Sequence, residues 1–191
     1  MSNSEKLNQD FNLFYCNDEQ MKPRITKPIS LKLLGCVYYG DPFHSHKEGS
    51  VKNEIGRLWE RFEKTCSMHI DEVKRISVEK NVAWEAHIQT QEYANTKEYA
   101  IFAGIEVREP AAAPLDFFYK ELPETKYAVF KLKGNSFITG LDYIYNTWLP
   151  NSKYKESHGY MLWRYDEKTK ALDNPDCVLE AYIPVEEKNV E

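Results

Sequence analysis

The chain has 191 residues, 42% hydrophobic and 29% charged, which is ordinary for a globular protein and enough for one large domain or two small ones. The formal net charge is −5, and no segment gathers the Lys and Arg of a phosphate-binding face, so direct nucleic-acid binding is not expected. No apolar run approaches the roughly 18 residues of a membrane span, and no secretory leader is found, so we expect a cytoplasmic protein.

The cysteines and histidines give no sign of a metal or a disulfide. The cysteines lie far apart along the chain and form no Cys-x-x-Cys pair, so free, mostly buried thiols are expected: Cys16, Cys36, Cys66 and Cys177. His44 and His46 lie in a loop without a clear third ligand. The sequence therefore predicts no metal site, and no cofactor motif is found.

The first half of the chain predicts a strand, a helix and two strands. Residues 1–27 lack sustained periodicity and are expected to form an N-terminal arm. A strand is predicted over 29–39, and a helix begins near Ser50, which is a plausible N-cap. Further strands are predicted near 82–89 and 98–107. The helix carries one apolar stripe at helical spacing: Val51, Ile55, Leu58, Phe62 and Cys66.

The second half predicts the same order of elements. Residues 108–124, rich in Pro and Ala, form a linker, and a strand follows over 126–132. A helix carries Phe137, Leu141, Ile144 and Trp148, and Pro150 is expected to end it. Strands near 159–166 and 176–185 complete this half, and residues 187–191 form a C-terminal tail.

The two halves also share a repeat. Residues 101–107 and 179–185 have the same apolar alternation, 78 positions apart. We therefore predict an α+β fold made of a duplicated βαββ module with pseudo-twofold symmetry, antiparallel sheets and two main helices. Copy one is residues 28–107 and copy two is residues 125–186, with a ligand groove between them. The same interval relates Glu85 to Trp163, and His87 to Tyr165.

Alternation assigns the two faces of the expected sheet. One face should contact the helices: Ile101, Ala103, Ile105, Val107, Leu179, Ala181, Ile183 and Val185. The other face should line the groove and carries Phe102, Glu106, Glu180 and Tyr182. Trp84, Ala86 and Ile88 are expected to point inward, which places Glu85 and His87 on the groove face.

The pattern resembles the GyrI-like, or effector-binding, domain family over about residues 28–186. The resemblance is carried by residues 58–62, 104–107, 126–130, 144–152, 165–166 and 182–185, which include the motifs Trp-Leu-Pro-Asn-Ser and Tyr-Ile-Pro-Val. It implies a SOUL-like fold from a bacterial protein. It also implies an aromatic cleft for bulky lipophilic cations, as in the sensing domains of AraC- and MerR-type multidrug regulators.

The resemblance also implies an acidic residue on the third strand of copy two, two positions before a tyrosine. Trp163 occupies that position, before Tyr165, and Glu85 is its equivalent in copy one. The hypothesis is a stand-alone drug-binding protein, linked to transcription regulation, in which carboxylates and aromatic rings hold a cation. The expected ligand-binding residues are Tyr39, Glu85, His87, Phe102, Glu106, Trp163, Tyr165, Glu180 and Tyr182.

Other interpretations stay open at this point. The glutamates could instead be solvated or paired with Lys and Arg, and the aromatic residues could pack only against each other. Relatives that hydrolyse cyclopropane-containing compounds suggest an enzyme with Glu85 or Glu180 acting beside a tyrosine, although no catalytic residue is assigned. Relatives that protect gyrase suggest a protein-interaction module, with gyrase or a regulator as the partner.

Overall fold

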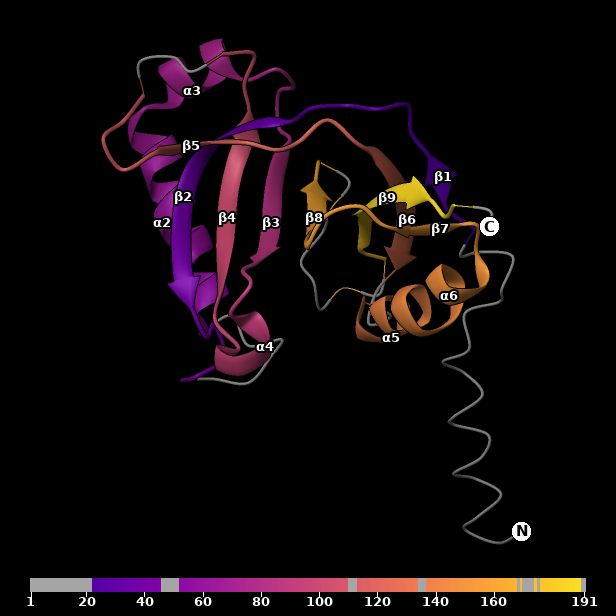
Figure 1. The fold of residues 1–191 in the computed structure, drawn as a ribbon. Helices are drawn as coiled ribbons and strands as arrows, with labels where there is room; N and C mark the ends of the chain where they lie inside the picture. Colours follow the sequence, from indigo (N-terminus) through magenta and orange to yellow (C-terminus); the bar gives the residue numbers. More distant parts are fainter. Residues whose placement is uncertain are drawn as a thin grey trace, which may run out of the picture.

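The computed structural model describes residues 22–45, 52–109, 113–133, 137–167, 169, 174 and 176–189. These residues form an α+β fold with one large antiparallel sheet and few helices (Figure 1). Most of the predicted N-terminal arm, together with Cys16, His46, Ser50 and Val51, lies outside the described residues.

Nine strands form the sheet. They are β1 Arg24–Ile25, β2 Lys32–Gly40, β3 Ala83–Gln89, β4 Tyr99–Glu106, β5 Phe118–Glu121, β6 Lys126–Lys133, β7 Tyr154–Glu156, β8 Tyr160–Tyr165 and β9 Val178–Glu187. Their order is β1-β6-β9-β8-β3-β4-β2-β5, and β7 also pairs with β9. The six long strands agree with the predicted ones to within about three residues at each end, whereas β1, β5 and β7 were not predicted.

Two helical layers pack on the sheet. The first contains α2 Glu54–Met68 and the short α3 Ile70–Ile76, and the second contains α5 Phe137–Tyr143, the π-helix η4 Ile144–Trp148 and α6 Leu149–Asn151. A one-turn helix, α4 Tyr93–Thr96, joins β3 to β4. The N-cap of α2 is Asn53, whose side chain accepts a hydrogen bond from the Gly56 amide, so the prediction of Ser50 was wrong. Pro150 lies inside α6, one residue before the helical segment ends.

Both helical layers cover the same face of the sheet. Around α2, the buried residues of β2 and β4 include Leu34, Cys36, Ile101, Ala103 and Ile105. Around α5 and η4, they include Ala128, Phe130, Leu179, Ala181 and Ile183. The strand registers connect these two sets across β3 and β8, so they belong to one face. The predicted helix-facing residues of β4 and β9 are therefore confirmed.

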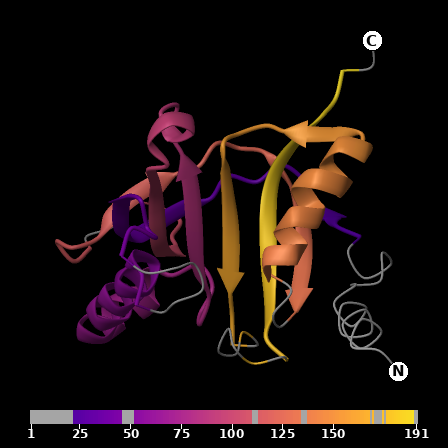
Figure 2. The same ribbon diagram turned by 90° about the horizontal axis from the view of Figure 1, so that it is seen from below.

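The two layers stand apart over the centre of the sheet. Figure 2 shows α2 on one side and α5 with η4 and α6 on the other, with the central strands visible between them. The centre is the antiparallel pair of β3 and β8, in which Glu85 lies opposite Trp163 and His87 lies opposite Met161. Side chains of these strands that point to the helix face therefore form the floor between the layers.

The opposite face has its own apolar core. It includes Trp84, Ala86, Phe102, Leu162 and Tyr182. The segments before β2 and before β6 pair with each other through Ile29 and Thr125, and Leu31 and Leu122 from these segments are buried in the same core. The face away from the helices is thus covered over the centre of the sheet.

This second core corrects the predicted orientation of β3. Trp84 and Ala86 pack with Phe102 and Tyr182 on the face away from the helices, and Ile88 packs against the same core. Glu85 and His87 therefore lie on the helix face, because successive strand residues point to opposite faces. The prediction had these two sets reversed, since it assumed that only the helix face was apolar.

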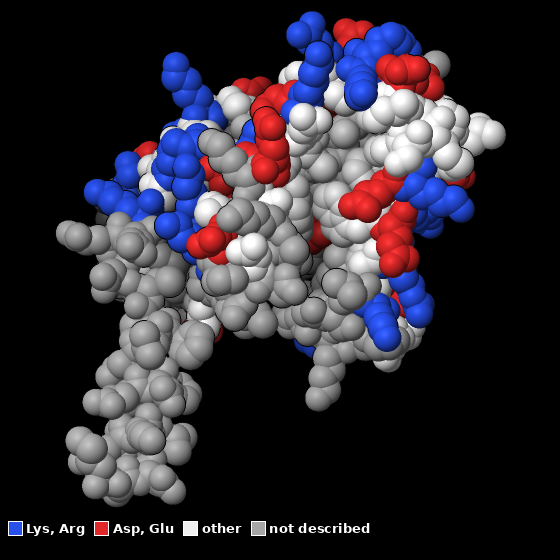
Figure 3. Space-filling view, turned by 180° about the vertical axis from the view of Figure 1, so that it is seen from behind, with Lys and Arg blue, Asp and Glu red and all other residues white. Residues whose placement is uncertain are grey.

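Other sequence-based expectations can be compared with the described part of the chain. Cys36, Cys66 and Cys177 are free, and Cys36 and Cys177 are buried, as predicted. Burial, followed by the nearby Cys36 and Glu63, raises the pKa of the Cys66 thiol to about 11. Among the described residues, no helix is long and apolar enough to cross a membrane. On the described surface in Figure 3, Lys and Arg are interspersed with Asp and Glu.

Candidate functional site

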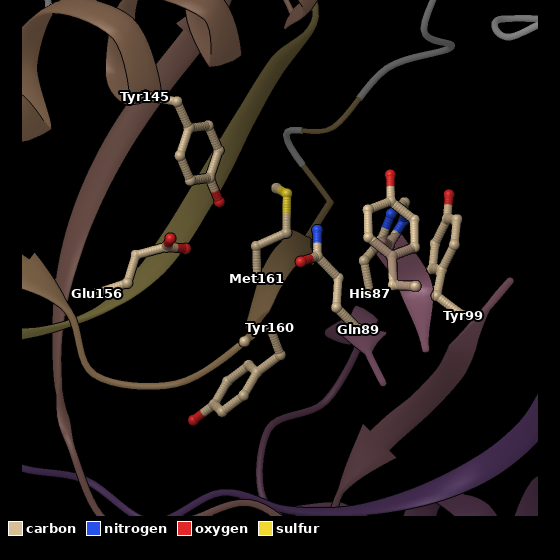
Figure 4. A pocket seen from close by; sticks show the side chains of 9 residues that line it. His87, Gln89, Tyr99, Tyr145, Glu156, Tyr160 and Met161 are labelled. Carbon is tan, nitrogen blue, oxygen red and sulfur yellow. The ribbon is translucent and has the colours of Figure 1, made fainter. Parts of the chain in front are cut away.

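A cavity of about 150 Å³ lies on the helix face, beside the central strands. Residues from both halves of the sheet and from the second helical layer line it: His87, Gln89, Tyr93, Tyr99, Tyr145, Glu156, Gly159, Tyr160 and Met161. Figure 4 shows Tyr145 and Glu156 on one side, His87 and Tyr99 on the other, and Met161 between them. The cavity is therefore predominantly aromatic, with one carboxylate in its wall.

One wall of the cavity is a row of rings. The His87 ring lies 5.6 Å from the Tyr99 ring, and Tyr99 meets Tyr93 edge to face at 5.7 Å. Such contacts fix the orientation of the rings, so the wall is formed before any ligand enters. On its outer side, the Lys97 ammonium lies 5.4 Å from the centre of the Tyr93 ring. This wall thus already has a cation beside it.

The other wall is formed by Tyr145 and Glu156. Tyr145 lies in the π-helix η4, and Glu156 is the last residue of the short strand β7. The Tyr145 hydroxyl is directed toward the Glu156 carboxylate (Figure 4), and burial, followed by the charge of this carboxylate, raises the pKa of Tyr145. Single π-turns inside helices are frequent at functional sites, because they change the direction in which a side chain points. Burial also raises the pKa of Glu156, and the nearby Tyr145 hydroxyl offsets this only in part.

Glu85 lies below this cavity as a buried carboxylate with three donors. Its Oε1 accepts a hydrogen bond of 2.6 Å from His87 Nε2, and its Oε2 accepts one from Trp59 Nε1 and one of 3.3 Å from the Tyr165 hydroxyl. Only 5% of the Glu85 side chain is exposed. Burial alone would raise the pKa of Glu85, but the hydrogen bond and charge of His87, with the bonds from Trp59 and Tyr165, hold this pKa below its usual value.

Tyr165 and Trp163 complete the surroundings of Glu85. Burial, followed by the charge of Glu85, raises the pKa of Tyr165 well above its usual value, so Tyr165 acts as a hydrogen-bond donor. The Tyr165 ring meets Trp59 at 4.7 Å. Trp163 is 7% exposed, packs edge to face on Phe137 at 6.1 Å, and does not line the cavity. Tyr165 and Trp163 therefore belong to the floor beneath the cavity and not to its walls.

The structure brings together only part of the predicted site. His87 lines the cavity, and Glu85, Trp163 and Tyr165 lie on the same face beside or below it. The other predicted residues lie on the opposite face of the sheet: Tyr39, Phe102, Glu106, Glu180 and Tyr182. The cavity therefore lies on the helix face and not on the face where the groove was predicted.

On that opposite face, the predicted glutamates belong to an ionic network around Arg164. Arg164 forms ion pairs of 2.8 Å with both Glu79 and Asp166, and one of 3.9 Å with Glu180. Glu180 also accepts a hydrogen bond from the Tyr182 hydroxyl and lies 3.7 Å from Lys131. The alternative that Glu180 is paired with basic neighbours thus agrees with the structure. Burial and the charge of Glu79 raise the pKa of Glu106.

Sequence reasoning missed most of the cavity wall. Tyr99 has the same strand parity as Ile101, so alternation would have found it once the cavity was placed on the helix face. Tyr145 comes directly after Ile144 of the second predicted helical stripe, and the sequence analysis assigned no role to it. Glu156 gave no signal, because its strand has only three residues. Within the described residues, no group of three or more His, Cys, Asp or Glu side chains is arranged to hold a metal ion.

A curated relative, the transcriptional regulator BrlR of Pseudomonas aeruginosa, is 25% identical over 167 residues, which cover 86% of this chain. The chain spans only 56% of the length of that relative. The relationship therefore concerns one part of a longer regulator.

Solved structures share the fold. The structure of SAV2435 bound to tetraphenylphosphonium has a TM-score of 0.61 at 12% identity, covering 87% of this chain and 94% of that one. The integron cassette protein of Vibrio cholerae has a TM-score of 0.56 at 14% identity, covering 87% and 97%. The C-terminal domain of EcmrR has a TM-score of 0.61 at 10% identity, covering 88% and 99%.

The family model described as "Cass2: Integron-associated effector binding protein" matches residues 24–185, which is most of the chain. This match includes every strand from β1 to β8 and the whole cavity wall. Its description names binding of an effector as the function, in agreement with the expectation of a binding protein rather than an enzyme. The chain therefore belongs to the family of Cass2 integron-associated effector-binding proteins.

Proposed function

We propose that this chain binds a lipophilic aromatic cation in the cavity between its second helical layer and the end of the β3–β4 hairpin. The observation that carries the proposal is the wall itself, in which Tyr99, Tyr145 and His87 surround a space that the carboxylate of Glu156 enters. Aromatic faces and a carboxylate that line the same cavity attract a cation whose own surface is apolar. The tetraphenylphosphonium in SAV2435, which has the same fold, supports this class of ligand.

The size of the cavity indicates how such a ligand would sit. A closed cavity of about 150 Å³ in another protein holds one benzene ring, and the cavity here has about the same volume. One aryl group would therefore be enclosed by the tyrosines, and the rest of a larger cation would extend out of the cavity. Its charge would then lie near the cavity mouth.

The arrangement of strands supports the finer proposal of a duplicated βαββ module. Read from one end, the long strands follow the order β2-β4-β3, and from the other end β6-β9-β8. Each set contains a first strand, a helical layer and two later strands in the same sequence order. A cavity at the junction would then be built from equivalent strands of the two copies.

Relatives suggest the biological setting. Because a longer transcriptional regulator contains a related segment, we propose that ligand binding here serves regulation, through a partner or as a stand-alone sensor. This role in regulation is proposed for the whole protein, and it depends on ligand binding being demonstrated first.

Calorimetry with two ions of similar shape and opposite charge tests the proposal. Tetraphenylphosphonium should bind at micromolar concentration and quench tryptophan fluorescence, because Trp59 lies next to the floor of the cavity. Tetraphenylborate, which is an anion, should bind at least about tenfold more weakly, since it meets a carboxylate and ring faces. Equal affinity for both ions, or binding of neither, would contradict the proposal.

A further inference from the structure

Two carboxylates lie close enough to the cavity to attract a cation, and they differ in whether their charge is already compensated. Glu85 is the equivalent of the position where the resemblance implies the pocket acid. Glu156 is on a short strand that the sequence did not predict. Which of them a ligand meets follows from their contacts and burial.

Glu85 is compensated by the protein. Three donors from three different elements, in α2, β3 and β8, hold its two oxygens. His87 lies between Glu85 and the cavity, so His87 lines the cavity and Glu85 does not. A cation could reach Glu85 only by displacing His87 and breaking the 2.6 Å contact. A buried carboxylate that loses such a partner is strongly destabilised.

Glu156 is in the opposite situation. It lines the cavity, and the neutral hydroxyl of Tyr145 is directed toward its carboxylate (Figure 4). Within the described residues, no ion pair involves Glu156, whereas its neighbour Lys155 pairs with Glu186 at 3.1 Å. Its register partner in β9 is Val185, which belongs to the apolar core under the second helical layer. Glu156 is therefore an exposed residue of the cavity wall, and no positive side chain among the described residues forms an ion pair with its carboxylate.

The other wall strengthens this difference. Lys97 lies beside the Tyr93 ring on the β4 side of the cavity. A ligand cation would be repelled by Lys97 and attracted by Glu156, so its charge should lie against the second helical layer. Its aryl groups would then contact Tyr99 and Met161.

Resting on the proposed function, we infer that Glu156, oriented by Tyr145, is the residue that selects cationic over neutral ligands, and that Glu85 has a structural role. The charge preference of the site then depends on β7 and η4. Both lie outside the strands that contain the repeat, so the position of the acid departs from the one that the repeat suggested. Glu156 is thus a specificity-determining residue.

The experiment compares a cation with a neutral compound that has similar aryl groups. Tetraphenylphosphonium and triphenylphosphine oxide are titrated into the wild type and into Glu156→Gln, with Glu186→Gln as the matched control on the exposed end of β9. Glu156→Gln should weaken tetraphenylphosphonium binding roughly tenfold and change triphenylphosphine oxide binding less than about twofold. Glu186→Gln should change neither. Tyr145→Phe should give a smaller loss for the cation alone.

The outcomes separate the two proposals. If the wild type binds tetraphenylphosphonium and Glu156→Gln retains the full preference for the cation, this inference is wrong while the proposed function stands. A loss of both ligands to the same extent would also overturn it, because that result indicates damage to the cavity shape. If the wild type binds neither compound, the proposed function and the inference both fail. Circular dichroism and thermal unfolding of each variant show whether the fold is retained.

Discussion

Glu85 and Trp163 lie directly opposite each other across the antiparallel pair of β3 and β8. They are separated by 78 residues, the same interval that separates Ile101 from Leu179. An antiparallel pair that joins equivalent positions places them at the centre of the sheet, where a twofold relation between the halves would have its axis. The two side chains are very different, because Glu85 gathers three donors and Trp163 packs on Phe137.

The first prediction concerns the stability provided by the contacts of Glu85. Glu85→Ala should lower the free energy of unfolding by about 3 kcal/mol, because it leaves the Trp59 indole N–H and the Tyr165 hydroxyl without their acceptor in a buried region. Urea denaturation followed by fluorescence measures this. Glu186→Gln, an exposed control, should stay within about 0.5 kcal/mol of the wild type. A loss in Glu85→Ala no larger than in this control would show that the buried network contributes little.

The second prediction concerns the pH dependence of that stability. The pKa of Glu85 is held below its usual value of 4.5 in the folded chain, so the unfolded chain takes up the proton more readily. The stabilisation is therefore complete at neutral pH and is lost as pH falls below about 4.5 and through the folded pKa. Urea unfolding between neutral and acidic pH should show a steeper loss for the wild type than for Glu85→Gln, in which this position does not titrate. Parallel curves would contradict the direction of the shift.

The sequence alone predicted the helix-facing residues of β4 and β9 correctly, but it did not predict the position of the site. The reason is physical. The alternation at 101–107 and 179–185 identified the helix face correctly, because those strands lie directly under α2 and η4. In β3, Trp84 and Ala86 are as apolar as any helix-facing residue, but they pack in the second core. When both faces of a sheet are buried, hydrophobicity shows the alternation and not which face bears the helices.

The cavity wall was harder to predict because local sequence does not determine its elements. Tyr145 lies in the π-helix η4, whereas the apolar stripe of Ile144 and Trp148 fits an ordinary α-helix equally well. The strand that carries Glu156 exists through its pairing with β9, a contact between distant segments. At Trp163, where the resemblance implies an acid, the sequence has an indole, and this indole packs in the core under the second helical layer.

The third prediction links cation binding to the ionisation of Glu156. Burial raises the pKa of this carboxyl above its usual value, so its charged form is lost sooner than for an exposed glutamate as pH falls. Tetraphenylphosphonium affinity should therefore decline as pH falls through this raised pKa. His87 also lines the cavity, so the comparison that isolates Glu156 is between the wild type and Glu156→Gln across the same pH range. The variant should lack the part of the decline that belongs to the carboxylate, and identical pH profiles would contradict the assignment.

The fourth prediction separates the aromatic contribution from the charge. Tyr99→Ala removes a ring that contacts both His87 and Tyr93, so it opens the wall opposite Glu156. Tetraphenylphosphonium and triphenylphosphine oxide should both bind roughly five- to tenfold more weakly, because each loses an aryl contact of about 1 kcal/mol and some burial. Tyr99→Phe keeps the ring and should retain most of the affinity for both. This equal loss contrasts with Glu156→Gln, which should affect the cation alone. If Tyr99→Ala instead weakened only the cation, charge recognition would lie on the β4 wall, and the division of the cavity into an apolar wall and an acidic wall would be wrong.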